Sequence, residues 1–133
     1  MTTGDLTKVH SKVETLDQAT LSPFNVVVLR NVMIEPIEIF LKSIGKKSGL
    51  ALNVEFGGYD MVMQDALSGL DGNLNQDTNA VMIFAKLDTL SWKLARDFYA
   101  LSKEQITYEI EQIGNWVSDV LSALTKKIEG IIL

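Results

Sequence analysis

The stretch of sequence that decides the fold is FNVVVLRNVMIEPIEIFLKSIGKKSGLALNVEFGGYD, residues 24–60. Residues 25–29 contain three consecutive valines and a leucine, which is typical of a central strand covered on both faces. A helix is predicted over 34–44, with Gly45 placed to end it and with an apolar stripe formed by Ile34, Ile37, Leu41 and Ile44. In 50–56 apolar and more polar residues alternate, which predicts an edge strand and makes the whole stretch a parallel strand–helix–strand unit.

The next part of the chain adds a second central strand. Residues 80–85, AVMIFA, are apolar throughout, and a short helix over 61–67 with a polar loop over 68–79 precedes them. Because an alternating edge strand lies between two central strands in the sequence, the predicted spatial order is 2-1-3. This order begins a flavodoxin-like or Rossmann-like parallel sheet in a three-layer α/β/α fold.

Two helical segments follow this strand. Residues 90–101 carry apolar residues at helical spacing, and Ser102 with Gln105 predicts a capping box at the start of a long helix. The apolar stripe of the long helix is Ile106, Ile110, Ile113, Val117, Val120, Leu124 and Ile128. Gly130 is placed to end this helix, and 131–133 is typical of the opening of a fourth strand, cut short within the fold. Since unpaired apolar strands seek partners, we predict a homodimer or a strand-swapped assembly.

The N-terminal residues 1–22 are polar, with apolar residues spaced as in a short amphipathic helix. These apolar residues are Leu6, Val9, Val13 and Leu16. We expect a docking arm here, followed by one α/β domain over 23–133. The N-terminus has no long apolar run and no segment reaches the ~20 apolar residues of a membrane span, so we expect neither a signal peptide nor a membrane protein. The predicted localisation is cytoplasmic.

The composition of the chain excludes several classes of function. A length of 133 residues, 47% of them hydrophobic, fits one domain that can bury its own core. The net charge of -5 and the isolated pairs Lys46-Lys47 and Lys126-Lys127 argue against a nucleic-acid partner. The absence of cysteine excludes disulfides, thiol catalysis and cysteine-type zinc sites. The only histidine, His10, lies in the N-terminal arm, so no Ser-His pair is expected at the sheet.

A doubly wound sheet binds ligands beyond the carboxyl ends of its strands. The residues nominated there are Arg30, Asn31, Lys86 and Asp88. Arg30 and Asn31 precede a helix, so guanidinium, amide and backbone N–H groups could hold an anion together. Alternatively, Asn31 caps the helix and Arg30 lies on the surface, since asparagine is a preferred cap. Glu35 weakens the anion site by adding negative charge to the first turn.

The end of the second strand supplies two further candidates for ligand binding, Gly58 and Asp60, although a Gly-Gly pair favours a tight turn. Asp88 stands where receiver domains carry a phospho-accepting aspartate. We favour a structural role for Asp88 in a turn or a helix cap, because this chain lacks the acidic pair that receiver domains carry after the first strand. Lys86 either pairs with Asp88 or faces solvent.

Motifs for a metal, a phosphate or a nucleophile are missing. Residues 71–77 space oxygen ligands like a calcium loop, but Gln76 and Met82 stand where glycine and glutamate are required, so a solvated turn is favoured. The chain lacks G-x-S-x-G, Walker and G-x-G-x-x-G sequences. We therefore predict no metal site, no cofactor and no catalytic residue in this segment. Trp116 is assigned to the core or an interface, and Trp92 is the aromatic residue least easily assigned.

Two blocks of the sequence resemble one family. They are VVVLRNVMIEPIEIFLKSIGKKSGLALNVEFGGYDMVMQDAL, residues 26–67, and NAVMIFAKLDTLS, residues 79–91. Together they resemble the N-terminal domain of FkbH-like proteins of the haloacid dehalogenase superfamily, with Glu35-Pro36 and Gly58-Tyr59-Asp60 distinctive in combination. The resemblance implies an SGNH-hydrolase-like, Rossmann-type fold. In full-length relatives a haloacid-dehalogenase-like catalytic domain comes after it.

The activity that the resemblance implies is biosynthetic and belongs to that later domain. Family members load a glyceryl unit from a phosphorylated donor onto an acyl carrier protein, and no D-x-D-x-T pattern occurs here. SGNH hydrolases would place Gly-Asp-Ser where this chain has Leu29-Arg30-Asn31-Val32. The leading hypothesis is a non-catalytic binding domain whose partner is an acyl carrier protein or its own catalytic domain. The alternatives are a divergent hydrolase or transferase using Asn31 and Asp88, and an anion-binding module.

Overall fold

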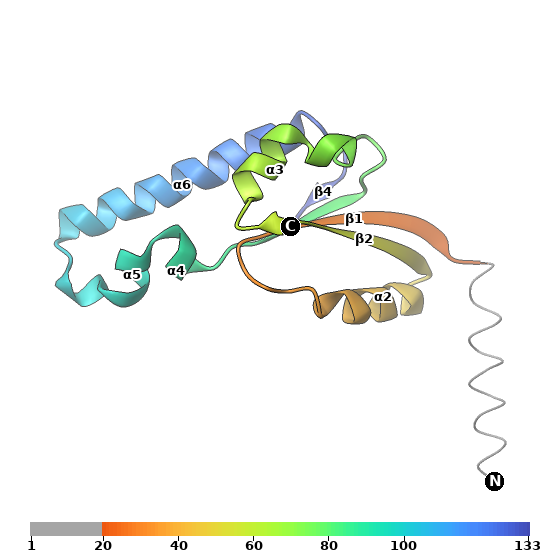
Figure 1. Ribbon diagram of the computed structural model, residues 1–133, viewed down its shortest axis with the longest axis horizontal. Helices are drawn as coiled ribbons and strands as arrows, with labels where there is room; N and C mark the ends of the chain where they lie inside the picture. Colours follow the sequence, from red (N-terminus) through yellow and green to blue (C-terminus); the bar gives the residue numbers. More distant parts are fainter. Residues whose placement is uncertain (1–19) are drawn as a thin grey trace, which may run out of the picture. The chain divides into compact units, whose positions relative to one another are not determined.

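The computed structural model describes residues 20–133, and its framework is a four-stranded sheet (Figure 1). The strands stand in the order β2-β1-β3-β4. Their bounds are Ser22–Arg30 for β1, Leu50–Tyr59 for β2, Ala80–Phe84 for β3 and Ile131–Ile132 for β4. β1 runs parallel to β3, with Val26 opposite Ala80, and β3 runs parallel to β4. The α/β class and the 2-1-3 strand order predicted from the sequence are confirmed.

Two strands are longer than the sequence predicts. β1 begins at Ser22 rather than at residue 25, and Pro23 lies inside its first part, where a missing ladder N–H is tolerated. β2 continues through Gly57 and Gly58, so the predicted tight turn at these glycines is wrong, and the chain turns at Asp60 instead. The predicted docking arm falls mostly on residues 1–19, which lie outside the described part of the chain.

The described chain divides into two compact units, one formed by residues 20–24 with 36–53 and the other by residues 25–35 with 54–133. The first unit contains α2, which spans Ile37–Lys47. The prediction that Gly45 ends this helix is wrong. A Cβ atom built on Gly45 would stand 2.6 Å from Cγ of Leu52, so glycine is needed for the close approach of helix and strand.

The packed face of α2 also differs from the predicted stripe. Ile37 and Leu41 are half-buried and Gly45 is buried, whereas Ile44 is 61% exposed. Residues four apart share one face of a helix, so the face centred on Leu41 continues to Gly45 and leaves Ile44 to one side. The prediction that Ile44 belongs to the packed apolar stripe is therefore wrong.

The second unit holds the hydrophobic core. Its helices are α3 (Val62–Ser68), α4 (Leu87–Leu90), α5 (Trp92–Arg96) and α6 (Lys103–Thr125), and its 3-10 turns are η1 (Leu70–Gly72) and η2 (Phe98–Ala100). α3 packs against α6. The buried core is formed by Val27, Leu29, Val62, Ala66, Leu74, Val81, Val120, Ala123, Leu124 and Ile128. This packing places two helices beside the central strands.

Helix α6 begins at the predicted capping box. The backbone N–H of Gln105 donates to Oγ of Ser102 at 3.1 Å, and the N–H of Ser102 donates to Oε1 of Gln105 at 2.8 Å. The helix ends at Thr125, several residues before Gly130, so the predicted end is wrong. Four unsatisfied N–H groups at a helix start make caps strongly selected, whereas the last turn of a helix frays and is set less sharply by single residues.

Residues 90–101 form shorter elements than predicted. Ser91 has an extended backbone that separates α4 from α5, and its Oγ accepts a hydrogen bond from the N–H of Leu94 at 3.3 Å. Ser91 thus caps a new helix instead of continuing the previous one. Within residues 20–133, no helix has the length and apolar character needed to cross a membrane.

Candidate functional site

The carboxyl ends of β1, β2 and β3 are joined by backbone hydrogen bonds within the second unit. The N–H of Asp60, after β2, donates to the carbonyl of Arg30 at 3.1 Å. The N–H of Asn31, after β1, donates to the carbonyl of Phe84 at 3.1 Å. This edge is where a parallel sheet offers its ligand crevice, and the residues nominated from the sequence lie at or shortly after these strand ends.

Asn31 connects the ends of β1 and β3 through its side chain. Its Oδ1 accepts from the N–H of Lys86 at 2.6 Å, and its Nδ2 donates to the carbonyl of Lys86 at 3.3 Å. The residue is only 2% exposed. The alternative that Asn31 caps the helix is wrong, because α2 begins at Ile37 after Pro36 and has no side-chain cap. Asn31 thus extends the pairing of β1 and β3, and both polar atoms of its side-chain amide take part in this contact.

Arg30 is buried, so the alternative that placed it on the surface is wrong. Its residue exposure is 8%, and Nη2 lies 2.6 Å from Oε1 of Glu35. Nη1 donates to the carbonyl of Val32 at 3.3 Å, and the guanidinium carbon lies 5.8 Å from the ring centre of Phe56. The carboxylate of Glu35 thus occupies the place that a bound anion would need.

Lys86 and Asp88 form an ion pair after β3. Nζ of Lys86 lies 3.3 Å from Oδ2 of Asp88, and Nη2 of Arg96 lies 3.9 Å from the same oxygen. Oδ1 of Asp88 is buried without a hydrogen-bond partner in the described residues. Of the two alternatives for Lys86, the pairing with Asp88 is the one observed, although the lysine side chain stays 60% exposed.

Gly58 is engaged by a buried carboxylate that the sequence did not nominate. Its N–H donates to Oδ2 of Asp65 at 2.8 Å, and Asp65 is 8% exposed. A Cβ atom built on Gly57 would stand 2.5 Å from the same oxygen, so glycine is required for Asp65 to reach the strand. The sequence signal is a glycine pair followed by an acidic residue in the next helix, which predicts a close backbone contact.

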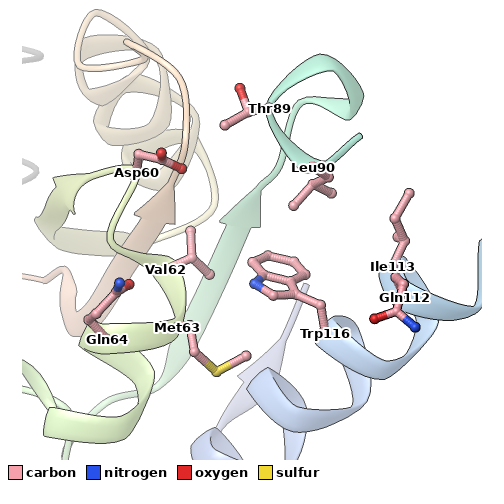
Figure 2. A pocket seen from close by; sticks show the side chains of 9 residues that line it. All are labelled: Asp60, Val62, Met63, Gln64, Thr89, Leu90, Gln112, Ile113 and Trp116. Carbon is pink, nitrogen blue, oxygen red and sulfur yellow. The ribbon is translucent and has the colours of Figure 1, made fainter. Parts of the chain in front are cut away.

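A cavity of about 330 Å³ opens at this edge of the sheet (Figure 2). Its polar lining residues are Asp60, Gln64, Thr89 and Gln112, and its apolar lining residues are Val62, Met63, Leu90, Ile113 and Trp116. The volume lies within the range of small-molecule sites, ~300–1,000 Å³. Of the six residues nominated from the sequence, only Asp60 lines the cavity.

Asp60 has an unusual backbone and an unpaired side chain. Its φ is 54°, in the left-handed region that costs an L-residue free energy, and asparagine and aspartate tolerate this region best. Asp60 is exposed, and its carboxylate makes no ion pair or side-chain hydrogen bond with any other residue in 20–133. Strained residues of this kind cluster at ligand sites.

The opposite wall of the cavity comes from α6. Trp116 is partly buried, packs against the hydrophobic core and also lines the cavity, as Figure 2 shows. Its assignment to the core was therefore incomplete. Gln112 and Ile113 stand about one helical turn before Trp116, so one face of the helix supplies all three. The signal in the sequence that could have identified this wall is Gln112, a polar residue next to Ile113 of the predicted apolar stripe.

The lining of this cavity has one hydroxyl, on Thr89, and one carboxylate, on Asp60, and no hydrogen bond joins them in the described residues. The lining contains a carboxylate, amides and a hydroxyl, without serine or histidine. In the described part of the chain, no group of three or more histidine, aspartate or glutamate side chains could hold a metal ion. Comparisons with protein-family models, with curated proteins and with solved structures gave no match.

Proposed function

We propose that this chain is a non-catalytic binding domain whose cavity at the carboxyl edge of the sheet holds a small molecule. The observation that supports the proposal most directly is the unpaired carboxylate of Asp60 in a 330 Å³ cavity whose far wall is Trp116. A charged group, neutral polar groups and an aromatic ring around a preformed space are the usual makeup of a ligand site. The position at the strand ends agrees with the rule for parallel sheets.

Binding is favoured over hydrolysis because three polar side chains next to the cavity, those of Ser91, Asn31 and Asp88, already make contacts within the protein. Ser91, the serine after β3, donates from Oγ to Oε2 of Glu109 at 2.7 Å and accepts from the N–H of Leu94. Asn31 spans two strand ends, and Asp88 pairs with two cations. An attacking hydroxyl needs a base within hydrogen-bond reach, and no hydrogen bond joins the hydroxyl of Thr89 to the carboxylate of Asp60.

The sequence resemblance supports a place for this domain beside a catalytic domain. We propose that it is the N-terminal domain of an FkbH-like protein, which presents a ligand or an acyl carrier protein to that catalytic domain. A D-x-D-x-T motif encoded after residue 133 in the same gene would support this placement. A gene product without such a motif would count against it.

The binding proposal is tested by a fragment screen read by NMR. The chain has two tryptophans, and only Trp116 lines the cavity, while Trp92 is 57% exposed on α5. A true cavity ligand is expected to shift the indole N–H signal of Trp116 and the backbone signals of Thr89 and Asp60, and to leave the indole signal of Trp92 unchanged. A library that shifts neither the Trp116 signal nor its neighbours would overturn the proposal.

A further inference from the structure

Resting on the proposed binding function, we infer that the ligand of this cavity is an organic cation, an amine with an apolar body, recognised through the carboxylate of Asp60. Asp60 is the only charged residue in the lining of the cavity. A ligand that enters must therefore satisfy one negative charge, two amides and one hydroxyl beside five apolar lining side chains. These groups together select the charge and the shape of the ligand.

The cations near this edge already face other carboxylates. Arg30 lies 2.6 Å from Glu35, and Lys86 lies 3.3 Å from Asp88. Arg96 also faces Asp88, at 3.9 Å. None of these pairs includes Asp60, so within the described residues its charge has no protein partner. Asp60 is exposed, so water solvates its carboxylate in the free protein. A positively charged ligand replaces that water with a charge-assisted hydrogen bond, which is stronger than a neutral one.

The remaining polar groups of the lining suit an ammonium group. The side-chain oxygens of Gln64, Thr89 and Gln112 are neutral acceptors, and an ammonium carries three donors. An anionic ligand would meet the carboxylate of Asp60 without a lining cation to offset the repulsion. The net charge of the chain, -5, also raises the local concentration of cations over anions.

The apolar wall suits the body of such an amine. Figure 2 shows the indole of Trp116 near Leu90 and Val62, with Asp60 on the other side of the cavity. Tryptophan is the best aromatic partner for a cation held over its ring. Met63 also lines the cavity, and methionine sulfur makes favourable contacts with aromatic rings. A flat hydrocarbon body carrying one ammonium group meets both requirements.

The experiment compares three probes of one shape and different charge: 2-phenylethylamine, 2-phenylethanol and phenylacetate. Each is titrated at neutral pH into the full chain, and the shift of the Trp116 indole signal gives its affinity. The amine is expected to bind at least about fivefold more tightly than the alcohol, because a charged hydrogen bond is worth more than a neutral one. Phenylacetate is expected to bind most weakly.

The variant Asp60→Asn removes the charge and keeps a residue that tolerates the left-handed backbone. It is expected to abolish the preference for the amine over the alcohol. Asp71→Asn is the matched control, since Asp71 also has a positive φ, 53°, is exposed in η1 and does not line the cavity. This control is expected to keep the full preference. Asp60→Gly, which also permits the backbone, is expected to behave like Asp60→Asn.

The possible outcomes separate the two proposals. If the alcohol or phenylacetate shifts Trp116 as readily as the amine, the cavity binds ligands but the inference about charge is wrong. If Asp71→Asn loses the preference as much as Asp60→Asn, the overall charge of the protein selects the ligand and the role of Asp60 is overturned. If no probe shifts Trp116 while the chain remains folded, the inference fails, and the fragment screen decides the proposed function separately.

Discussion

Asn31 joins the ends of β1 and β3 through hydrogen bonds of its side chain. Its side-chain amide both donates to and accepts from the backbone of Lys86, so two strands stay joined beyond their last ladder bonds. Arg30, beside it, has its guanidinium held by Glu35 rather than by a ligand. Arg30 and Asn31, the two side chains nominated first from the sequence, therefore stabilise the fold around the site. Asp60 is the nominated residue that lines the cavity.

Replacing Asn31 is expected to weaken the fold. Asn31→Ala leaves the N–H and carbonyl of Lys86 without their partners and is expected to lower the free energy of unfolding by about 1–3 kcal/mol. Urea unfolding measures this change. Asn73→Ala is the control, because Asn73 makes an exposed side-chain bond to Glu55, and it is expected to change the stability by less than about 0.5 kcal/mol. Equal losses in both variants would contradict the role of Asn31.

A pair of glycine substitutions tests the contact between Asp65 and β2. Gly57→Ala places a Cβ atom 2.5 Å from Oδ2 of Asp65 and 3.1 Å from Cδ2 of Leu29, so it is expected to destabilise the protein by about 1–3 kcal/mol. Gly114→Ala, inside α6 with open space around it, is expected to stabilise the protein by about 0.5–1 kcal/mol. Thermal or urea unfolding measures both. A neutral Gly57→Ala would mean that Asp65 is free to move away.

At the scale of elements, α6 carries out two tasks along one helix. Its C-terminal part supplies buried core residues, Val120, Ala123 and Leu124, and its middle supplies the cavity wall. Farther toward the N-terminus the apolar stripe is only partly covered, since Ile106 is half-buried and Ile110 is 57% exposed. The capping box was predictable because four consecutive residues encode it. Which part of the stripe would be buried was not predictable, because that depends on where α3 packs.

This division of α6 predicts unequal costs for two leucines three residues apart. Leu124 is fully buried in the core, so Leu124→Ala is expected to cost about 2–5 kcal/mol of stability. Leu121 is 38% exposed, so Leu121→Ala is expected to cost less than about 1 kcal/mol. Denaturant unfolding of the two variants, measured side by side, checks the orientation of the helix. A reversed order would show that α6 is rotated about its axis.

At the scale of the whole molecule, the sheet ends at β4, whose outer edge is unpaired among the described residues. The N–H of Leu133 donates to the carbonyl of Val81, and the carbonyl of Leu133 accepts from the N–H of Ile83, so this segment is paired on its β3 side. Ile131 is 59% exposed and Leu133 is 67% exposed. An apolar edge of this kind favours pairing with a second strand.

The homodimer predicted from the sequence therefore has a specific test. We expect sedimentation to show a dimer at high concentration, and Ile131→Lys to shift it toward the monomer, because a charged side chain at a strand edge opposes pairing. Ser118→Lys is the control, since Ser118 is an exposed residue of α6 and the charge change is the same. A protein that sediments as a monomer at all concentrations would contradict the prediction.

The sequence by itself determined the α/β class, the order of the first three strands and the capped start of α6. These features depend on local periodicity and on short capping patterns, which the chain carries whatever lies around it. Three features were decided by the tertiary structure alone: the burial of Arg30, the hydrogen bonds from the side chain of Asn31 to Lys86, and the cavity lined by Asp60 and Trp116. Each of these features requires contacts between residues far apart in the sequence, and such contacts leave no periodic pattern in the local sequence.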